Sequence, residues 1–594
     1  MYRSVALILA VCGITNALGC KCSPSDACWP ADSNWASLNH TVRGRLIRTV
    51  PAAAVCYPNE PNYNPSECTT VLANWTKSSF HSADPVSVDD PVWSHNSCNP
   101  IYPNGTSITG NVHAGLQGCT IGNYPVYVIN ATEAEHIQAG ILFAKQWNLR
   151  LNIKNTGHGS DRSINQGSLS IWTHHMKEIQ FHENFQLHQC RKLESGGNIT
   201  TMAATLGAGV QDGEMFAALA KHNAMAVGGT NMDVGVVGWA TGGGHGLATG
   251  MYGMGADNII EAKIVTPAGN IVTANACQHE DLFWAIRGGG GGTYGVIVSV
   301  TVQAHPMPML TMIKLMLSAR NRTTEHEWYR LVAKAHRYLA DLQDNGIHGY
   351  YTLSSSPLAM DGALLLYNAK NGTADKLLRP FQNFLKNHET IVTAAVEPIN
   401  TLPLYDIVQT MPSIESVGKT EVAKASRFIP QRAFEENVER LADTLELIMS
   451  RQDSPDGVSS PSISGTMTGS KVAVDNALNP AWRDSVVHLI VSQRWNESLP
   501  MALREQAVHN MTYGKGYALR QLAPDTGCYV NEVKHTLTKA NPFEPNWQWS
   551  LFGSHYPRLR AIKSSYDPEG LLWCRHCVGS EAWAEKDGRL CPVF

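Results

Sequence analysis

The chain has 594 residues, a length at which one hydrophobic core normally gives way to two or more domains. Hydrophobic residues make up 43% of it and charged residues only 16%, with a formal net charge of -4. A core of ordinary size can therefore form. The absence of a basic run argues against a nucleic-acid partner.

The N-terminus has the pattern of a secretory signal. Arg3 precedes an apolar stretch from Val5 to Ile14, and Ala17-Leu18-Gly19 supplies small residues for cleavage. The stretch is shorter than the ~20 residues of a membrane-spanning helix, so we expect a signal peptide over 1–19 and no membrane anchor. Nine glycosylation sequons favour the secretory route, at Asn39, Asn74, Asn104, Asn130, Asn198, Asn321, Asn371, Asn496 and Asn510.

Cysteine usage agrees with an oxidising compartment. Removal of Cys12 with the signal leaves thirteen of the fourteen cysteines, so at least one thiol is unpaired or paired between chains. Seven cysteines crowd the region from Cys20 to Cys119, where we expect disulfides. Cys574 and Cys577 form a C-x-x-C pair, which is only half of a zinc site, so a disulfide is favoured there as well.

In chain order, residues 20–120 predict an irregular, disulfide-linked extension. Val126–Ile129 predicts a strand, and Thr132–Glu135 reads as a capping box opening a helix that runs to about Trp147. Leu149, Leu151 and Ile153 alternate with polar residues and predict a second strand. This strand–helix–strand unit ends in a glycine-containing turn at 155–160.

A second unit follows, with a strand near 205, a helix over about 212–222, a strand near 226 and a turn at 228–231. A third glycine run lies at 242–246. Residues 259–273 predict a hairpin, 281–287 a helix and 296–302 a strand. Pro306 and Pro308 mark a domain boundary. Beyond it, amphipathic helices are clearest at 325–342 and 431–450.

Residues Gly290 to Gly295 match G-x-G-x-x-G, but a helix precedes them and a strand follows. A dinucleotide fingerprint needs the opposite order, so we reject a Rossmann site. Glycine turns still allow close approach of backbone to a ligand, and consecutive N–H groups can hold a phosphate.

Several motifs together carry a family resemblance. Lys154–His158 with Ser168–His175 resembles the flavin loop of berberine-bridge-enzyme-like oxidoreductases, a group of the vanillyl-alcohol-oxidase / p-cresol-methylhydroxylase flavoprotein family. The helix at 281–287 with its following glycines, and the segments at 529–532, 552–559 and 567–581, resemble further family signatures. The resemblance spans roughly 120–585.

The resemblance implies an α+β fold. A two-subdomain FAD-binding domain would occupy 121–306, an α+β substrate domain with an antiparallel sheet 307–524, and a C-terminal segment, 525–585, would complete the FAD site. It implies a covalent bond from His158 to the 8α methyl of the flavin, for which a glycine-flanked histidine at a strand end is a suitable position. The cofactor-binding residues it implies are Asn155, Thr156, Gly157, His158, Gly159, Ser160, Gly229, Thr230, Asn231, Val234, Gly235, Gly238, Gly243, His245, Gly246, Ile264 and Asn531.

The chain departs from the family pattern at three positions. Many relatives form a second flavin bond through a cysteine, where this chain has Asn231, so we expect a single covalent link. Trp239 stands where the family often has histidine. His555 stands where an asparagine is common, which weakens transfer of that flavin contact.

The catalytic base is left open between two candidates. Asp475 is the acid nearest a segment in which some relatives place a glutamate, and related enzymes use a tyrosine, here Tyr529. A base needs ~3 Å reach and a suitable pKa, which a sequence does not give. The adjacent His174 and His175 point to opposite faces of a strand and are interpreted as structural, and no metal site is predicted.

These observations predict a secreted FAD-dependent oxidase that passes electrons from a small organic substrate, such as a specialised-metabolite intermediate, to O2. The alternatives are a carbohydrate or alcohol oxidase of the same family and a non-redox isomerase or cyclase that retains FAD. A secreted carbohydrate-binding or structural glycoprotein without flavin is the third class.

Overall fold

A computed structural model describes residues 19–187, 190, 201–410, 417–532, 544–586 and 588–593. The predicted signal peptide up to residue 18, Cys12 and the Asn198 sequon lie outside the described residues. None of the helices described is both long and apolar enough to cross a membrane. The mixed helices and largely antiparallel sheets confirm the predicted α+β class.

The first sheet contains the predicted strand–helix–strand unit. Its order is β1-β2-β4-β3, in which β2 (Tyr127–Asn130) and β3 (Leu151–Lys154) each pair in parallel with β4 (Leu169–Trp172). Helix α5 (Ala134–Gln146) connects β2 to β3 and buries Ile137 and Ile141 in the apolar cluster that it forms with this sheet. The predicted capping box is wrong, because the N-cap is Glu133 and makes no side-chain cap hydrogen bond.

The second sheet has the order β5-β6-β10-β8-β9, with β7 paired to β10. The predicted hairpin is confirmed as β8 and β9, and the predicted helix at 281–287 as α10 (Glu280–Ile286). The bounds are β5 (Ile179–Phe185), β6 (Thr201–Gly207), α7 (Asp212–Ala220), β7 (Ala224–Ala226), α8 (Val236–Thr241), α9 (Thr249–Tyr252), β8 (Ile259–Val265), β9 (Ile271–Asn275) and β10 (Val296–Pro306).

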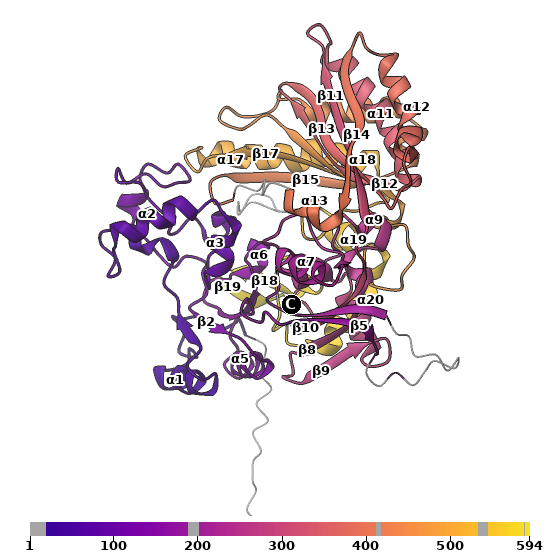
Figure 1. Cartoon of the computed structure of the whole chain (residues 1–594). Coiled ribbons are helices and arrows are strands. Elements are labelled where there is room, and N and C mark those ends of the chain that lie inside the picture. The colour runs from indigo at the N-terminus through magenta and orange to yellow at the C-terminus, as the bar shows by residue number, and fades with distance from the viewer. Residues whose placement is uncertain are drawn as a thin grey trace, which may run out of the picture.

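The third sheet belongs to the predicted substrate domain and begins just after the proline boundary. It is antiparallel, with the order β14-β11-β13-β12-β16-β17-β15, and Figure 1 shows it above the other two, flanked by helices α11 and α12. The strands are β11 (Met309–Ala319), β12 (Ile347–Ser355), β13 (Leu358–Tyr367), β14 (Val392–Pro403), β15 (Glu421–Pro430), β16 (Ser462–Thr466) and β17 (Ser485–Trp495).

The helices of this domain bury its largest apolar cluster. The helix predicted at 325–342 is confirmed as α11 (Glu325–Asp344). The range 431–450, predicted as one helix, is divided by a break at 436–437, and α15 (Val438–Met449) is its longer part. The apolar sides of α11 and α15 pack into that cluster with α12. The remaining helices are α12 (Thr373–Lys386), α13 (Leu404–Thr410), α14 (Arg432–Glu435), α16 (Ala481–Asp484), α17 (Met501–His509) and α18 (Gly516–Leu522).

Both ends of the chain pack around the first two sheets. In the N-terminal region, β1 (Leu46–Arg48) pairs antiparallel with β2, and disulfides join Cys22 to Cys28, Cys56 to Cys68 and Cys98 to Cys119. The other elements are α1 (Asp32–Thr41), α2 (Pro65–Asn74), α3 (Ser78–Ala83), α4 (Ala114–Gln117), α6 (Ser160–Ser163), α19 (Trp547–Phe552), α20 (Tyr556–Tyr566), β18 (Trp583–Lys586) and β19 (Arg589–Pro592).

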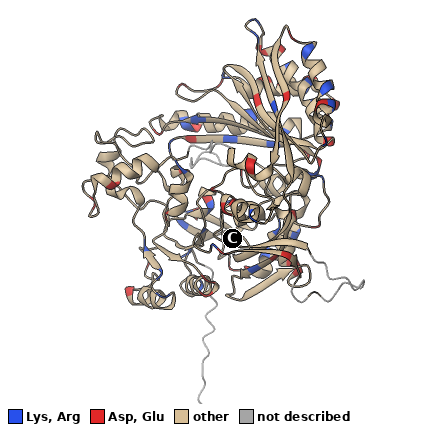
Figure 2. Ribbon diagram, in the orientation of Figure 1, with Lys and Arg blue, Asp and Glu red and all other residues tan. Residues whose placement is uncertain are grey.

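The sequence prediction that most cysteines form disulfides is confirmed, although the fold decides which cysteines are partners. Cys574 pairs with Cys577, and the buried Cys528 is a free thiol among the described cysteines. Cys190 pairs with Cys277, and Cys20 pairs with Cys591 across 571 residues. Acidic and basic residues are interspersed along the ribbon (Figure 2).

The long-range disulfide is expected to stabilise the chain more than a short-range one. In the chain-entropy account, a disulfide that closes a loop of 571 residues stabilises the folded state by about 6 kcal/mol, and one that closes a loop of 6 residues by about 2 kcal/mol. The double variant Cys20→Ser/Cys591→Ser should therefore lose more free energy of unfolding than the control Cys22→Ser/Cys28→Ser, whose disulfide spans 6 residues. Urea titration measures both, and equal losses would contradict this account.

Candidate active site

One cavity collects most of the predicted cofactor-binding residues. Segments from the first and second sheets and from the C-terminal region line it. The predicted residues among its lining are Asn155, Thr156, Gly157, His158, Gly159, Gly229, Thr230, Asn231, Val234, Gly235, Gly238, His245 and Asn531, together with the candidate base Tyr529.

His158 is positioned by a turn that follows β3. Gly157 has φ of 86°, and a Cβ there would lie 2.8 Å from the carbonyl oxygen of Ser87, so only glycine fits without a shift. The preceding Lys154 is buried, and its ammonium donates to the carbonyl oxygens of His81 and Asp84 at 3.0 and 2.7 Å. The turn is therefore fixed against the N-terminal region, and the side chain of His158 faces the cavity.

The N-terminal region also supplies a partner for His158. Nδ1 of His158 lies 2.9 Å from Oδ2 of Asp89, whose side chain is 1% exposed. Although burial opposes its ionisation, the neighbouring His158 and His81 hold the pKa of the Asp89 carboxyl below its ordinary value. The sequence analysis missed Asp89, because no local pattern connects it to a turn almost 70 residues later.

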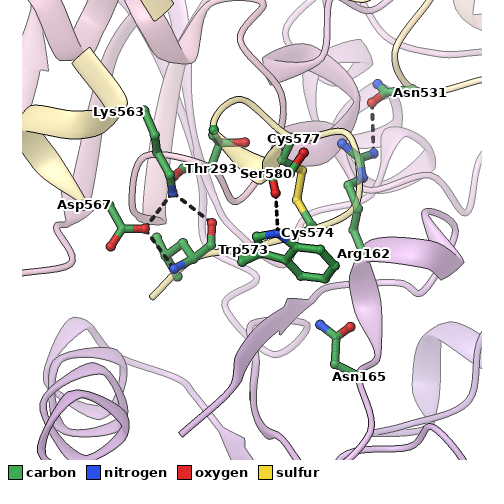
Figure 3. Close-up of a disulfide and its surroundings, with 12 residues drawn as sticks. Arg162, Asn165, Thr293, Asn531, Lys563, Asp567, Trp573, Cys574, Cys577 and Ser580 are labelled. Atoms are coloured by element: carbon green, nitrogen blue, oxygen red, sulfur yellow. Dashed lines mark hydrogen bonds and ion pairs between the residues drawn. A yellow bond between two sulfur atoms is a disulfide. The ribbon is translucent and has the colours of Figure 1, made fainter. Parts of the chain in front are cut away.

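Asn531 joins three parts of the cavity wall. Its amide oxygen accepts a hydrogen bond from Nη2 of Arg162 at 2.9 Å, a contact drawn in Figure 3. Its amide nitrogen donates to the hydroxyl of Tyr529 at 2.8 Å and to the carbonyl oxygens of Gly238 and Trp239 at 3.3 Å each. The C-terminal segment is thus tied to α6 and α8, as the resemblance implies.

Tyr529 lies in the cavity wall as a protonated phenol. Its hydroxyl accepts hydrogen bonds from the backbone N–H of Gly244 at 3.0 Å and from Asn531. Burial, assisted by the nearby Glu532 carboxylate, raises the pKa of the Tyr529 phenol above its ordinary value. A base must give up its own proton first, so this environment suits hydrogen-bond donation better than proton abstraction.

A second titratable group in the wall is His245, which Glu532 orients. Nε2 of His245 lies 2.8 Å from Oε1 of Glu532, and its Nδ1 lies 3.0 Å from the Tyr350 hydroxyl. The other oxygen of Glu532 lies 3.4 Å from Nδ1 of the buried His488. Although burial opposes ionisation, the two imidazoles hold the pKa of the Glu532 carboxyl well below its ordinary value.

The residues present fit a bound FAD. Arg162 is the only arginine or lysine among the lining residues, and its buried Nη1 has no hydrogen-bond partner, which leaves a donor for an anionic group such as a pyrophosphate. A Cβ at Gly238, which also lines the cavity, would meet no atom within 4 Å. The bare backbone there leaves room for a ligand to approach closely.

Four predicted residues support the cavity without lining it. Ser160 donates from its hydroxyl to the carbonyl oxygen of Gly157 at 3.3 Å, and Ile264 packs beneath Gly295. A Cβ at Gly246 would lie 1.7 Å from the carbonyl oxygen of Gly228, so that glycine allows two backbone segments to touch. Gly243 packs against Tyr529.

Asp475 is not brought to the cavity. Its side chain is 88% exposed, and its carboxylate accepts a hydrogen bond from the indole N–H of Trp284 at 2.8 Å. The sequence showed only that Asp475 is close to a family motif along the chain. In the fold its side chain faces solvent. His555, the third departure, packs against Trp284 and is also outside the lining.

The other two departures do line the cavity. Asn231 accepts from the backbone N–H of Asp233 at 2.9 Å, as in an Asx turn. The Trp239 indole donates to the carbonyl oxygen of His245 at 2.8 Å and packs against Gly244 and Gly255. Trp239 therefore helps to hold the backbone that carries His245.

Sequence analysis missed a stretch of wall from the C-terminal segment. Leu572, Trp573 and Cys574 line the cavity, and the Cys574–Cys577 disulfide lies beside Trp573 (Figure 3). Buried Lys563 holds this stretch by donating to Asp567 at 2.6 Å and to the carbonyl oxygens of Thr293 and Leu572. The C-x-x-C motif was visible in the sequence, but nothing local connected it to the cavity.

Comparison with known proteins agrees with this arrangement. Residues 125–275 match the family model described as FAD binding domain, and residues 528–579 match the one described as berberine and berberine like. The chain is 31% identical to the FAD-linked oxidoreductase patO of Aspergillus clavatus, over 100% of this chain and 99% of that protein. It is also 31% identical to the VAO-type flavoprotein oxidase VAO615 of Thermothelomyces thermophilus, with the same coverage.

Solved structures of flavoproteins share the fold of this chain. The VAO-type flavoprotein MtVAO615 from Myceliophthora thermophila C1 superposes with a TM-score of 0.83 at 30% identity, covering 97% of this chain and 100% of that one. Glucooligosaccharide oxidase from Acremonium strictum, at 19% identity, shares the fold with a TM-score of 0.61 over 77% of this chain and 92% of that one.

The fold and the cavity define an FAD-binding flavoenzyme of the vanillyl-alcohol-oxidase type. The chain belongs to the family of FAD-linked oxidoreductases with a berberine-like C-terminal segment, which confirms the resemblance found in the sequence.

The buried carboxyl of Asp212 makes the stability of the protein depend on pH in a way that can be measured. This first residue of α7 is buried, accepts from the backbone N–H of Gly229 at 3.0 Å through one oxygen, and has no partner for the other. Burial raises the pKa of its carboxyl to about 8. The native state therefore holds this proton where the unfolded chain has lost it. The contribution of the protonated Asp212 carboxyl to the free energy of unfolding is complete below about pH 4 and is lost as pH rises through about 8.

Asp212→Asn should remove this dependence. From pH 5 to 8, the free energy of unfolding of the variant relative to the parent should rise by about 1.4 kcal/mol per pH unit. Urea titrations at each pH measure the difference. Parallel pH curves for the two proteins would contradict the assignment of a neutral, buried carboxyl.

Proposed function

We propose that the protein is a secreted oxidase that holds FAD through a single covalent bond to His158 and oxidises a small organic substrate, with O2 as electron acceptor. The observation that carries the proposal is that His158 faces the same cavity as Tyr529 and Asn531, on a turn that requires glycine. Bound FAD supplies a two-electron acceptor, which O2 regenerates with release of hydrogen peroxide.

In this proposal Tyr529 orients the substrate. Its hydroxyl already accepts two hydrogen bonds, so its own proton remains to be donated to a substrate oxygen or nitrogen. Replacement by phenylalanine would remove that donor and leave the Gly244 N–H without its acceptor.

His245 is the group best placed to take the substrate's proton. The anionic Glu532 accepts from Nε2–H, which leaves Nδ1 as the basic nitrogen and stabilises the imidazolium formed on protonation. Nδ1 lies opposite the Tyr350 hydroxyl, whose proton has a second acceptor in Thr468 at 3.3 Å. A substrate hydroxyl can therefore replace Tyr350 at Nδ1 without leaving Tyr350 unpaired. The exposed position of Asp475 gives it no part in this step.

The substrate class remains that of the sequence prediction, an intermediate of specialised metabolism, with sugars and simple alcohols as the alternatives. Peroxide release screened across sugars, aromatic alcohols and alkaloid-like amines distinguishes them. For a non-redox isomerase or cyclase, turnover under anaerobic conditions would proceed without bleaching of the flavin absorbance, an outcome that would overturn the oxidase proposal.

His158→Ala should abolish retention of yellow colour by the denatured polypeptide. The natively secreted parent should keep the flavin through denaturation and show its mass on the peptide spanning residues 155–160. His175→Ala is the matched control, because that imidazole is exposed and outside the cavity lining. A parent protein that denatures to a colourless chain would contradict the covalent link.

His245→Gln should lower the rate of flavin reduction by a substrate found in the screen by about 10²–10⁴-fold, the usual contribution of a positioned base. The covalent flavin should remain, since His158 is intact. Asp475→Asn, the control at the other sequence-based candidate, should react at the parental rate. If the two variants behave alike in stopped-flow measurements, His245 is not the proton acceptor.

A further inference from the structure

A buried imidazole of the substrate domain lies close to the cavity without a well-formed hydrogen bond. His488 is on β17 and its side chain is 0% exposed, and neither ring nitrogen has a hydrogen-bond partner of good geometry among the described residues. The rings of Phe428, Trp482 and Tyr529 surround it at centroid distances of 4.8, 5.8 and 6.4 Å. Because buried polar atoms are nearly always paired, an imidazole enclosed by aromatic rings needs a specific acceptor.

The acceptor within reach is Glu532, which is also incompletely paired. Its Oε2 lies 3.4 Å from Nδ1 of His488 and makes no hydrogen bond, whereas Oε1 lies 2.8 Å from Nε2 of His245. Glu532 and His245 line the cavity, and His488 is outside the lining. A small shift of the His488 ring turns the longer contact into an N–H···O hydrogen bond and pairs both atoms at once. One carboxylate then joins an imidazole at the cavity to an imidazole of the substrate domain.

Few titratable groups face this carboxylate. Among the described residues, the ion-pair partners of Glu532 are His245 and His488. The phenols of Tyr350 and Tyr529 face the same cluster and stay neutral, because burial raises their pKa values. Burial also lowers the pKa of His488, so this ring is neutral at ordinary pH and donates from one nitrogen only. Since a carboxylate accepts hydrogen bonds, that nitrogen is Nδ1.

We propose that His488 is a positioning residue, which donates Nδ1–H to Oε2 of Glu532 and so keeps the pair of Glu532 and His245 free of an additional proton. His245 is then available as a base near neutral pH. This role rests on the proposed function of His245. It adds a residue of the substrate domain that no motif near His245 or Glu532 indicates, and it makes the base depend on how that domain packs against the cavity.

The direction of the effect follows from competition for one proton. The Glu532 carboxylate and the neutral His245 imidazole bind a first proton as a pair, whichever of them carries it. A hydrogen bond donated to Oε2 stabilises the carboxylate, so it lowers the affinity of the pair for that proton. By the usual strength of a hydrogen bond to a charged group, loss of the donor should raise the apparent pKa of the pair by about 1 or more. A larger fraction of the base is then already protonated at low pH.

His488→Leu removes the donor, and His488→Asn keeps an N–H close to the position of Nδ1. The rate of flavin reduction by a substrate from the screen is measured against pH by stopped flow in the flavin-loaded enzyme. In His488→Leu we expect the acid limb of this profile to move up by about 1 pH unit or more, with a loss of about 10-fold below it and a rate near the parental one at high pH. His488→Asn should restore most of the parental profile.

His348→Leu is the matched control and should keep the parental pH profile. His348 is also buried in the third sheet, but its Nδ1 lies 3.2 Å from the carbonyl oxygen of Met467. An acid limb that stays in place in folded His488→Leu, or an equal displacement in His488→Asn, overturns the role of His488.

Infrared spectroscopy reads the carboxyl without turnover. In a His245→Gln background Glu532 alone carries the proton of the pair, and its protonated-carboxyl band is the one that a further Glu532→Gln change abolishes. This band should appear at higher pH when His488→Leu is added. If His488→Leu does not fold, the background variant decides, because a Glu532 already protonated at about pH 7 there overturns the proposal. A parental rate of flavin reduction in His245→Gln instead overturns the proposed base while the infrared difference persists, so the two failures are distinguishable.

Discussion

The close contact between the N-terminal region and the turn after β3 is the constraint on which the rest of the site depends. Gly157 has no side chain because Ser87 occupies that space, and Lys154 is buried because its ammonium reaches two carbonyl oxygens of the same segment. A buried ammonium is costly unless it is fully hydrogen bonded, so this contact can form in very few ways. Its geometry directs the imidazole of His158 toward the cavity and its Nδ1 toward Asp89.

The remaining walls are assembled from segments distant in sequence. Asn531 connects Arg162 of α6 with Tyr529 and with α8, and Glu532 connects His245 with the third sheet through His488. Lys563 plays a comparable part for the stretch from Leu572 to Cys574. Each of these polar side chains contacts partners from another part of the chain, so the cavity wall forms only when the three larger sheets and the C-terminal segment have packed together.

The difference between local patterns and contacts between distant segments explains which predictions succeeded. Local patterns were sufficient for the strand–helix–strand unit, the hairpin β8–β9 and helices α11 and α15, because periodicity and turn residues act over a few positions. The capping box at Thr132 was wrong, since the N-cap of the helix is Glu133, one residue later. Cysteine pairing was predicted in kind, but the partnership of Cys20 with Cys591 depends on where the two chain ends meet.

By itself, the sequence determined the fold class and the family, because these depend on short motifs whose residue types have few alternatives. It also identified His158 and Tyr529 as candidates. Only the tertiary structure decided that Asp475 faces solvent, that Tyr529 is a buried phenol, and that Asp89, Arg162, His245 and Glu532 meet around one cavity. The physical reason is that hydrogen-bond geometry and burial, which set the protonation state of a group, arise from residues far apart in the chain.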